Sequence, residues 1–212
     1  MTVQQNDPDE LLEVFDAAGR GTGRARSRAA VHLAGDWHQA FHCWIVRRQG
    51  LEVVLQRRAL AKDTFGGLWD AAAAGHWRFG ERPEEAAREI AEELGLDISF
   101  AELVYRGRER GSRRFANWLT DREHHQVYVL ADDRPLIEYR PDPSEVIGLA
   151  AFPAGRLVDL VAGRQTALAA NEAVSVGIDG RLAQVNVLVE RTDLVPYSAA
   201  RLRRMLRRVP QR

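Results

Sequence analysis

The sequence predicts an α/β (α+β) protein built on one mixed β-sheet with helices packed against it. Short runs of β-branched and aromatic residues recur along the chain, and they alternate with a few segments whose apolar residues follow helical spacing. The chain has 212 residues, 45% of them hydrophobic, which is enough for one sizeable core. This mixture of patterns is typical of a sheet covered by helices rather than of an all-helical protein.

Strands are expected wherever β-forming runs end at turn residues. The expected strands are Leu11 to Phe15, Gly21 to Arg28, Ala40 to Arg47, Leu51 to Leu55, Ala71 to Ala74, Ile98 to Arg106, Gln126 to Leu130, Val146 to Phe152, Val174 to Ile178 and Leu182 to Val189. Gln49-Gly50 and Asp179-Gly180 have the composition of hairpin turns. Arg108 to Arg122 is expected to be a polar connection, long enough to suggest a functional role.

Three helices are expected. The first begins at Pro83, which suits a first helical turn, and ends at Gly95 as a left-handed cap. A second helix follows Pro153, and Tyr197 to Val209 forms a third with a basic face. The apolar faces of the first and third helices consist of Ala86, Ala87, Ile90 and Leu94, and of Leu202, Met205, Leu206 and Val209.

Charge and cysteine content exclude some broad classes of function. Lys plus Arg equals Asp plus Glu at 30 each, so a membrane-surface protein is not expected and a nucleic-acid partner is unlikely on charge grounds. Cys43 is the single cysteine, which rules out an intrachain disulfide and fits a reducing compartment. No apolar run has the length of a membrane helix, and the first ten residues lack an apolar signal core, so we expect a cytoplasmic protein.

The most informative segment is the first helix, where carboxylates crowd together. Glu85, Glu89, Glu92 and Glu93 lie within one or two turns of each other, and like charges at that spacing destabilise a helix unless a cation lies among them. Carboxylate oxygens are preferred ligands of hard divalent metals, and Arg88 lies four residues from Glu92. The alternative is a solvated helix held by ordinary ion pairs.

This segment resembles the Nudix box, in which Gly and Glu precede the pattern Arg-Glu-apolar-x-Glu-Glu-x-Gly-apolar. The matching residues are Gly75, Glu81, Arg88, Glu89, Ile90, Glu92, Glu93, Gly95 and Leu96. Six residues instead of seven separate Glu81 from Arg88, so the loop rather than the metal-binding half departs from the pattern. Segments Arg28 to His32, Gly35 to His38, Trp44 to Val46 and Gly67 to Asp70 are similar to the branch that includes isopentenyl-diphosphate isomerase.

The resemblance implies a Nudix fold and hydrolysis, dependent on Mg2+ or Mn2+, of a small-molecule nucleoside diphosphate linked to another group. It implies that Glu89, Glu92 and Glu93 bind the metal, that the Gly75 carbonyl contributes, and that Arg88 orients the carboxylates. A carboxylate from a later loop completes the site in many such enzymes. Glu145 is our candidate for that general base, and a surface position at a strand start is an equal alternative. A homodimer is plausible from the family.

Other residues were weighed for substrate and metal binding. Trp77 and Arg78 in the box loop are candidate substrate-binding residues, with Trp77 able to stack on a base. His124 and His125 point to opposite sides of a strand, which makes a poor chelate, and His38 and His42 also fall in a strand, so a zinc site is not expected. Cys43 lies in an apolar strand and is expected to be a buried structural thiol.

The expected organisation is a disordered tail over residues 1–10, a Nudix domain over 11–165, and a C-terminal hairpin and amphipathic helix over 166–212 packed on that domain. Two rival functions remain open. A regulatory module could bind nucleotide without turnover, which the shortened loop favours and the intact carboxylates oppose. An isomerase-like activity on isoprenoid diphosphate is opposed by the absence of a cysteine just before the box.

Overall fold

The computed structural model describes residues 8–48 and 51–206. Its strands are β1 (Leu11–Phe15), β2 (Gly21–Ser27), β3 (Trp37–Arg47), β4 (Glu52–Arg58), β5 (Trp69–Ala71), β6 (Ala73–His76), β7 (Val104–Ala116), β8 (Leu119–Ala131), β9 (Val146–Pro153), β10 (Ala167–Ala169), β11 (Glu172–Val176), β12 (Leu182–Gln184) and β13 (Leu188–Glu190). Its helices are α1 (Arg28–Ala34), α2 (Pro83–Ala86), α3 (Arg88–Leu94), α4 (Ala154–Val161) and α5 (Ala199–Leu206). Short 3-10 turns occur at Phe100–Glu102, Leu136–Glu138 and Arg191–Asp193.

Strand β3 organises the main sheet. Along one edge it pairs in parallel with β8, from Trp37 opposite Arg122 to Val46 opposite Ala131. Its other edge is shared in turn by β1, β6 and β4, all antiparallel. The sheet continues from β4 through β9 and β11 to β12, and β7 extends it beyond β8. The predicted mixed sheet is therefore confirmed, with β3–β8 as its parallel pair.

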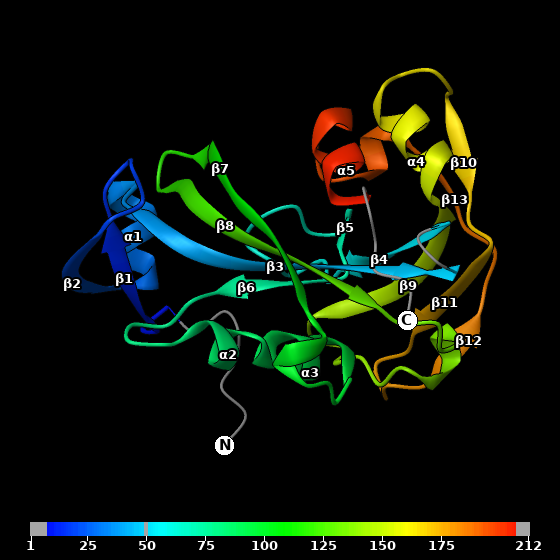
Figure 1. The fold of residues 1–212 in the computed structure, drawn as a ribbon, viewed down its shortest axis with the longest axis horizontal. Coiled ribbons are helices and arrows are strands. Elements are labelled where there is room, and N and C mark those ends of the chain that lie inside the picture. Colours follow the sequence, from blue (N-terminus) through cyan, green and yellow to red (C-terminus); the bar gives the residue numbers. More distant parts are fainter. Residues whose placement is uncertain (1–7, 49–50, 207–212) are drawn as a thin grey trace.

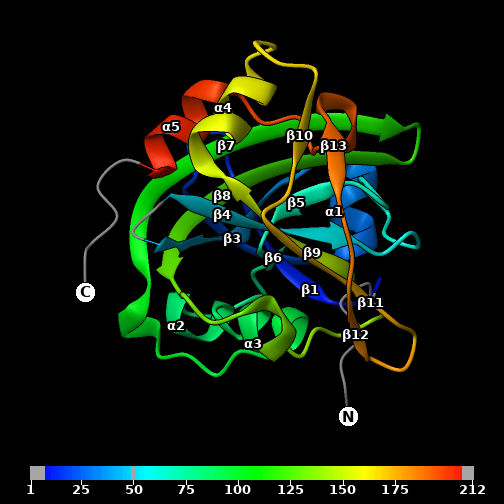
Figure 2. The ribbon, with the colours of Figure 1, turned by 90° about the vertical axis from the view of Figure 1, so that its right-hand side faces the viewer.

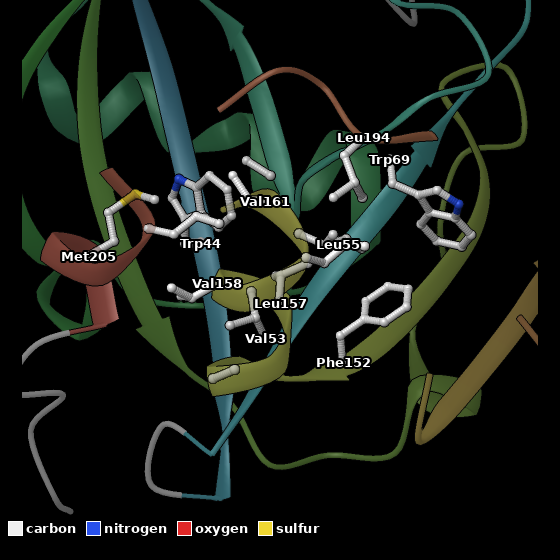
Figure 3. Close-up of a cluster of buried hydrophobic side chains, with 14 of the residues drawn as sticks. Trp44, Val53, Leu55, Trp69, Phe152, Leu157, Val158, Val161, Leu194 and Met205 are labelled. Carbon is white, nitrogen blue, oxygen red and sulfur yellow. The ribbon is translucent and has the colours of Figure 1, made fainter. Parts of the chain in front are cut away.

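Helices cover both faces of this sheet (Figure 1). Alternate residues of β3 point to opposite faces, as a pleated strand requires. Trp44 and Val46 belong to the core under α4 and α5, whereas Cys43 and Ile45 belong to the core shared with α3. Figure 3 shows the first core, in which Met205 of α5 lies beside Trp44. The expected burial of the Cys43 thiol is confirmed, since none of its surface is exposed.

The box helix begins and ends where its sequence signals predict. Pro83 occupies the first turn of α2, and Gly95 ends α3 in the left-handed region at φ 64°. The helical segment is broken at Ala87, which separates α2 from α3. Ile90 and Leu94 are completely buried, and their burial fixes which face of α3 carries the carboxylates.

The largest correction concerns Arg108 to Arg122, which is not a connection. β7 and β8 are 13 residues long and form an antiparallel hairpin that turns between Ala116 and Leu119 (Figure 2). The face of β8 that lines the cavity carries ionisable residues here instead of apolar ones. The alternation of apolar and polar residues that normally reveals a strand is therefore missing from this part of the sequence. The strand expected from Ile98 to Arg106 corresponds to the first part of β7. β7 begins only at Val104, because Phe100–Glu102 is a 3-10 turn.

Smaller corrections fall near the two ends of the chain. The expected strand from Leu182 to Val189 is divided into β12 and β13, and β13 pairs with β10 in a separate two-stranded sheet. Pro8 accepts a backbone hydrogen bond from Ala29, so this part of the expected tail is held on the domain. Residues 1–7, the turn at 49–50 and the expected helix end at Val209 lie outside the described residues.

The C-terminal hairpin and helix pack on the rest of the molecule. β11 joins the main sheet through β9, and the turn between β11 and β12 contains Asp179-Gly180, as predicted. The apolar face of α5 buries Leu202 and Met205 in the core beneath α4. None of the helices in the described part of the chain has the length and apolar character that crossing a bilayer requires.

Candidate active site

The carboxylates of α3 differ sharply in their exposure. Glu89 and Glu93 are buried, with 1% and 0% of their surface exposed, whereas the side chain of Glu92 is 38% exposed. Burial raises the pKa of Glu93 and raises that of Glu89 to about 8. Two carboxyl groups one turn apart in a buried position are costly to ionise unless a cation compensates them.

Arg88 holds this group of carboxylates in place. Its guanidinium forms ion pairs with Glu89 and Glu92, the latter at 2.9 Å, and also donates to the His76 carbonyl at 3.3 Å. Its Nε donates to Glu81 Oε1 at 2.8 Å, so Glu81 reaches the helix despite the shortened loop. The orienting role that the box pattern implies for Arg88 thus has a matching set of contacts.

Glu93 has one satisfied and one unsatisfied oxygen. Oε2 accepts hydrogen bonds from Gln56 Nε2 at 3.0 Å and from the Ala74 amide at 2.9 Å. Oε1 is buried and has no hydrogen-bond partner among residues 8–48 and 51–206. An orphaned carboxylate oxygen beside the buried Glu89 fits a divalent cation, which takes oxygen ligands. The donor set therefore suits the metal that the carboxylate pattern implies.

Gly75 lies directly against Glu89. A Cβ placed on this glycine would fall 2.1 Å from Glu89 Cδ, so a residue with a side chain would displace the carboxylate. The glycine therefore brings backbone, including the carbonyl expected to bind metal, into contact with the box helix. Gly75 and Glu89 both line the principal cavity.

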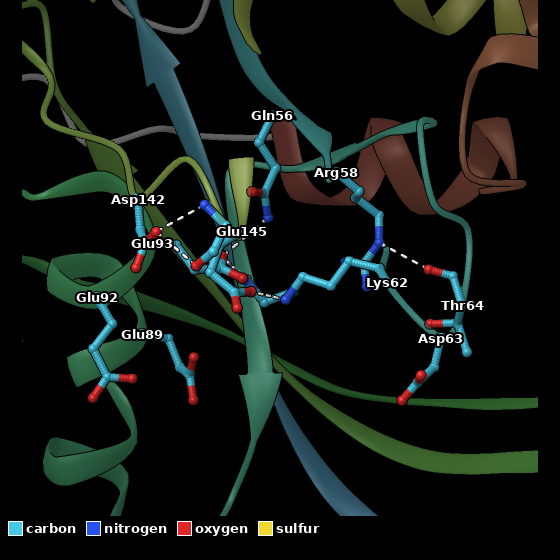
Figure 4. Close-up of polar contacts among 12 residues, drawn as sticks. Gln56, Arg58, Lys62, Asp63, Thr64, Glu89, Glu92, Glu93, Asp142 and Glu145 are labelled. Atoms are coloured by element: carbon cyan, nitrogen blue, oxygen red, sulfur yellow. Dashed lines mark hydrogen bonds and ion pairs between the residues drawn. The ribbon is translucent and has the colours of Figure 1, made fainter. Parts of the chain in front are cut away.

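Glu145 lies at the start of β9 and faces the same group. It is buried and forms a close ion pair with Lys62, whose side chain extends from the loop after β4 (Figure 4). Burial lowers the pKa of Lys62, and the nearby Glu93 carboxylate opposes that shift. Glu145 is thus buried rather than a surface residue, and Figure 4 shows it next to Glu93.

A second cluster of metal-binding side chains, absent from our sequence-based predictions, lies next to the first. His32 of α1, His38 of β3 and His76 of β6 present ring nitrogens within 4.8 Å of one another. Asp121 and Glu123 of β8 approach from the neighbouring strand, with His38 Nε2 at 3.5 Å from Asp121 Oδ1. We call these five residues the histidine cage.

Several atoms of the histidine cage make no hydrogen bond to the described residues, and its side chains have the protonation that metal binding requires. His32 Nε2, His38 Nε2 and Asp121 Oδ1 are buried and form no hydrogen bond within the described part of the chain. Burial lowers the pKa of His32 to about 4 and also lowers those of His38 and His76, so the imidazoles are neutral. Burial alone would raise the pKa of Glu123, but the interactions with His125, His76 and His38 together hold that pKa well below its usual value. Neutral imidazole and ionised carboxylate are the forms that bind metal.

Parallel pairing of β3 with β8 explains why these residues meet. His38 lies opposite Glu123 and Ala40 opposite His125, and Ala40 also lies opposite His76 of β6. His124 points to the other side of β8, where its ring lies 4.8 Å from that of Trp37. The expectation that His124 and His125 point to opposite sides of the strand was therefore correct. The histidines on the cavity side, however, lie near metal-binding side chains of other strands.

One cavity of about 270 Å3 connects these groups. Its wall includes Gly75 and Glu89 from the box region. It also includes four members of the histidine cage: His32, His76, Asp121 and Glu123. Three basic side chains line it as well: Arg28, Arg58 and Lys62. Phe65 and Phe115 also line it, and their ring centroids lie 4.8 Å apart. Cations beside metal-binding groups form an environment suited to a phosphorylated ligand.

The two residues expected to bind substrate lie elsewhere. Neither Trp77 nor Arg78 is among the described residues that line the cavity, and Glu92, Glu93 and Glu145 are not among them either. Trp77 packs against the core of α3, and Arg78 donates to Glu10 at 2.9 Å. The basic residues Arg28, Arg58 and Lys62 were missed by sequence reasoning, since single cations in a strand or loop carry no distinctive spacing.

Comparison with known proteins identifies the family of this chain. A match to the family described as the NUDIX domain covers residues 36–170. The chain belongs to the Nudix family. This Nudix protein is 32% identical to an uncharacterised Nudix hydrolase of Clostridium acetobutylicum, over 89% of this chain and 91% of the relative. It is 35% identical to an isopentenyl-diphosphate Delta-isomerase of Streptomyces griseus, over 70% of this chain and 74% of that protein.

The Nudix fold is also found by structural comparison. The crystal structure of DR0079 from Deinococcus radiodurans superimposes with a TM-score of 0.53 at 20% identity, covering 73% of this chain and 90% of that one. Our assignment of the box and of the isomerase-like branch is confirmed by these similarities. The Nudix match ends before β11, so the C-terminal hairpin and α5 follow the matched region.

Proposed function

We propose that this protein is a metal-dependent Nudix hydrolase that cleaves the diphosphate bond of a nucleoside diphosphate linked to another group. The observation that carries the proposal is the unsatisfied Oε1 of Glu93, which lies beside buried Glu89 on a helix at the cavity wall. Buried carboxylates with an unused oxygen suit a cation, and the cations of the same cavity suit phosphate.

In this proposal Glu89, Glu92, Glu93 and the Gly75 carbonyl hold Mg2+ or Mn2+. A divalent ion held by these residues would supply Lewis-acid chemistry for the reaction. Arg88 keeps Glu89 and Glu92 in position through its ion pairs. Arg28, Arg58 and Lys62 bind the phosphate oxygens and compensate charge that develops on them. The histidine cage holds a second divalent ion, for which its imidazole and carboxylate donors are suitable.

Glu145 serves as the general base. Water attacks phosphorus, its proton passes to a carboxylate oxygen of Glu145, and the bond to the departing phosphate oxygen breaks. Lys62, now paired with Glu145, is in position to pair with the phosphate when substrate enters. This exchange of partners would free Glu145 to accept the proton.

An isomerase role has less support. The similarity to an isomerase covers most of the domain, but the sole cysteine is buried in the core and burial raises the pKa of its thiol. Ala74 occupies the position just before Gly75. A thiol removed from the cavity cannot act on a ligand bound there.

The test is hydrolysis of a panel of nucleoside diphosphate derivatives, nucleoside triphosphates and prenyl diphosphates with Mg2+ or Mn2+. Glu93→Gln should abolish turnover, and the matched control Glu84→Gln, on the exposed side of α2, should retain it. Metal and nucleotide binding without turnover on any panel member would contradict the proposal and support a regulatory module. Rearrangement of a prenyl diphosphate without hydrolysis would support the isomerase instead.

A further inference from the structure

Helix α5 inserts one basic side chain into the active-site cavity, although it lies beyond the segment that matches the Nudix family. The side chain of Arg201 is only 13% exposed, and its Nε lies 2.5 Å from Glu109 Oε2. Its Cζ lies 4.5 Å from the ring centroid of Tyr197. Leu202 and Met205 anchor the helix in the core, so the position of Arg201 is fixed by packing.

One nitrogen of Arg201 contacts two histidines. Nη2 lies 3.3 Å from His125 Nδ1 and 3.4 Å from His42 Nδ1. A guanidinium nitrogen of this kind has two hydrogens, and it only donates. Both Nδ1 atoms must therefore accept, which leaves Nε2 as the nitrogen of each ring that carries a proton. The contact with Arg201 thus selects one tautomer of each ring.

That tautomer has a direct consequence for Glu123. His125 Nε2 lies 2.7 Å from Glu123 Oε2, and with its proton on Nε2 the ring donates a hydrogen bond to the carboxylate. The other oxygen, Oε1, lies 3.5 Å from His76 Nε2 in the histidine cage. One oxygen of Glu123 is therefore held by His125 while the other faces the metal-binding groups.

His42, Glu123 and His125 also satisfy the distance requirements of a metal site, but their orientation does not suit one ion. The two imidazole rings are stacked, with centroids 4.2 Å apart and an angle of 20° between planes. Their in-plane lone pairs are consequently almost parallel. A single ion about 2.0–2.1 Å from each nitrogen would lie out of line with both lone pairs. The stacked pair is better suited to hydrogen bonding than to chelation.

We propose that Arg201 is a positioning residue for the metal site of the histidine cage. It acts through the tautomer of His125, which orients the carboxylate of Glu123 toward the cage. A hydrogen bond of this kind to a metal-binding carboxylate contributes about 10- to 100-fold in metal affinity. The inference rests on the proposed function in one respect, namely that the histidine cage binds a metal ion. It makes α5 part of the active centre.

The first measurement addresses the tautomer directly. In the full-length protein, 15N–1H correlation spectra of the histidine side chains should show His125 with its proton on Nε2. Arg201→Gln removes the obligate donor and should allow a population with the proton on Nδ1. Arg203→Gln, an exposed residue of the same helix, is the matched control and should leave the spectrum unchanged.

The second measurement is cobalt affinity, followed by the visible absorption of imidazole-bound Co2+ with excess Mg2+ present to occupy the box carboxylates. Arg201→Gln should weaken Co2+ binding about 10- to 100-fold, and Arg203→Gln should not. Arg201→Lys keeps a cationic donor and should retain part of the affinity, which provides a second variant if the first unfolds. Unchanged tautomer and Co2+ affinity in Arg201→Gln would overturn the inference. Both readouts are independent of turnover, so failure of the hydrolase assignment would leave them interpretable.

Discussion

Arg88 Nε lies 2.8 Å from Glu81 Oε1, although the segment between the two residues is one position shorter than the Nudix pattern. The break at Ala87 accommodates the missing residue, because α2 ends there and α3 begins directly afterwards. Glu81 also accepts a hydrogen bond from the Arg78 amide at 2.9 Å, which ties the loop to the helix. The shortened loop therefore preserves the contact rather than displacing it.

Loss of the ion pairs of Arg88 should reduce the rate of catalysis more than it reduces the stability of the fold. Arg88→Gln removes ion pairs to Glu81, Glu89 and Glu92, so the carboxylates lose their common orientation. A misplacement of about 1 Å costs on the order of 100-fold in rate. Steady-state kinetics on the substrate found in the panel should show this fall in kcat/KM. Arg82→Gln, exposed at the start of the helical segment, should remain within twofold of the wild type, and equal losses in both variants would argue against a specific role for these ion pairs.

Replacement of the proposed base should separate chemistry from binding. Glu145→Gln keeps the size of the side chain but cannot accept a proton, so kcat should fall by about 10²- to 10⁴-fold. Circular dichroism and the melting temperature establish that the variant folds, and Mg2+ titration checks that metal binding persists. Turnover equal to the wild type would remove Glu145 from the mechanism and leave it as the partner of Lys62.

The raised pKa of Glu89 predicts a pH-dependent stability of the metal-free protein. Because the pKa of the folded state is about 8 and the ordinary value is 4.5, the folded protein binds this proton more tightly than the unfolded chain. The free energy of unfolding should therefore decrease as the pH rises between these values. Urea denaturation at pH 5 and pH 8 measures the change, and Glu89→Gln should reduce it. A pH dependence identical to that of the wild type would contradict burial of an ionisable Glu89.

Gly75 should not tolerate even a methyl group. The added Cβ of Gly75→Ala would lie 2.1 Å from Glu89 Cδ, so either the carboxylate or strand β6 must move. We expect a loss of activity on the order of 100-fold from the displaced carboxylate. Gly155→Ala is the matched control, since its Cβ would meet no described atom within 4 Å. Thermal unfolding and kinetics of both variants provide the comparison, and full activity of Gly75→Ala would contradict the close approach.

Local signals predicted the box helix because they act within a few residues. Pro83 and Gly95 are positioned by the backbone conformations that a helix start and a left-handed cap require. The apolar run of β3 and the turn at Asp179-Gly180 were recognised for the same reason. The carboxylates of the box follow directly from this helix, so the first part of the site was accessible from the sequence.

The histidine cage could not be predicted from local sequence signals. Its members come from α1, β3, β6 and β8, and only the pairing of β3 with β8 brings His38 beside Glu123. In addition, Asp121, Glu123 and His125 alternate on one face of β8, where strand patterns normally show apolar residues. Because these residues are polar, the segment was expected to be a connection. A strand that lines a polar cavity still points every second side chain to the same face, but those side chains are not apolar.

The β3–β8 pairing also has a consequence for how the molecule folds. The whole Nudix box lies between these two strands in the chain, so their parallel register forms only after a long loop has closed. Long-range pairing of this kind slows folding, because loop-closure entropy is lost before the contacts form. Divalent ions should consequently leave the refolding rate almost unchanged and instead slow unfolding, since the histidine cage exists only once the sheet is complete.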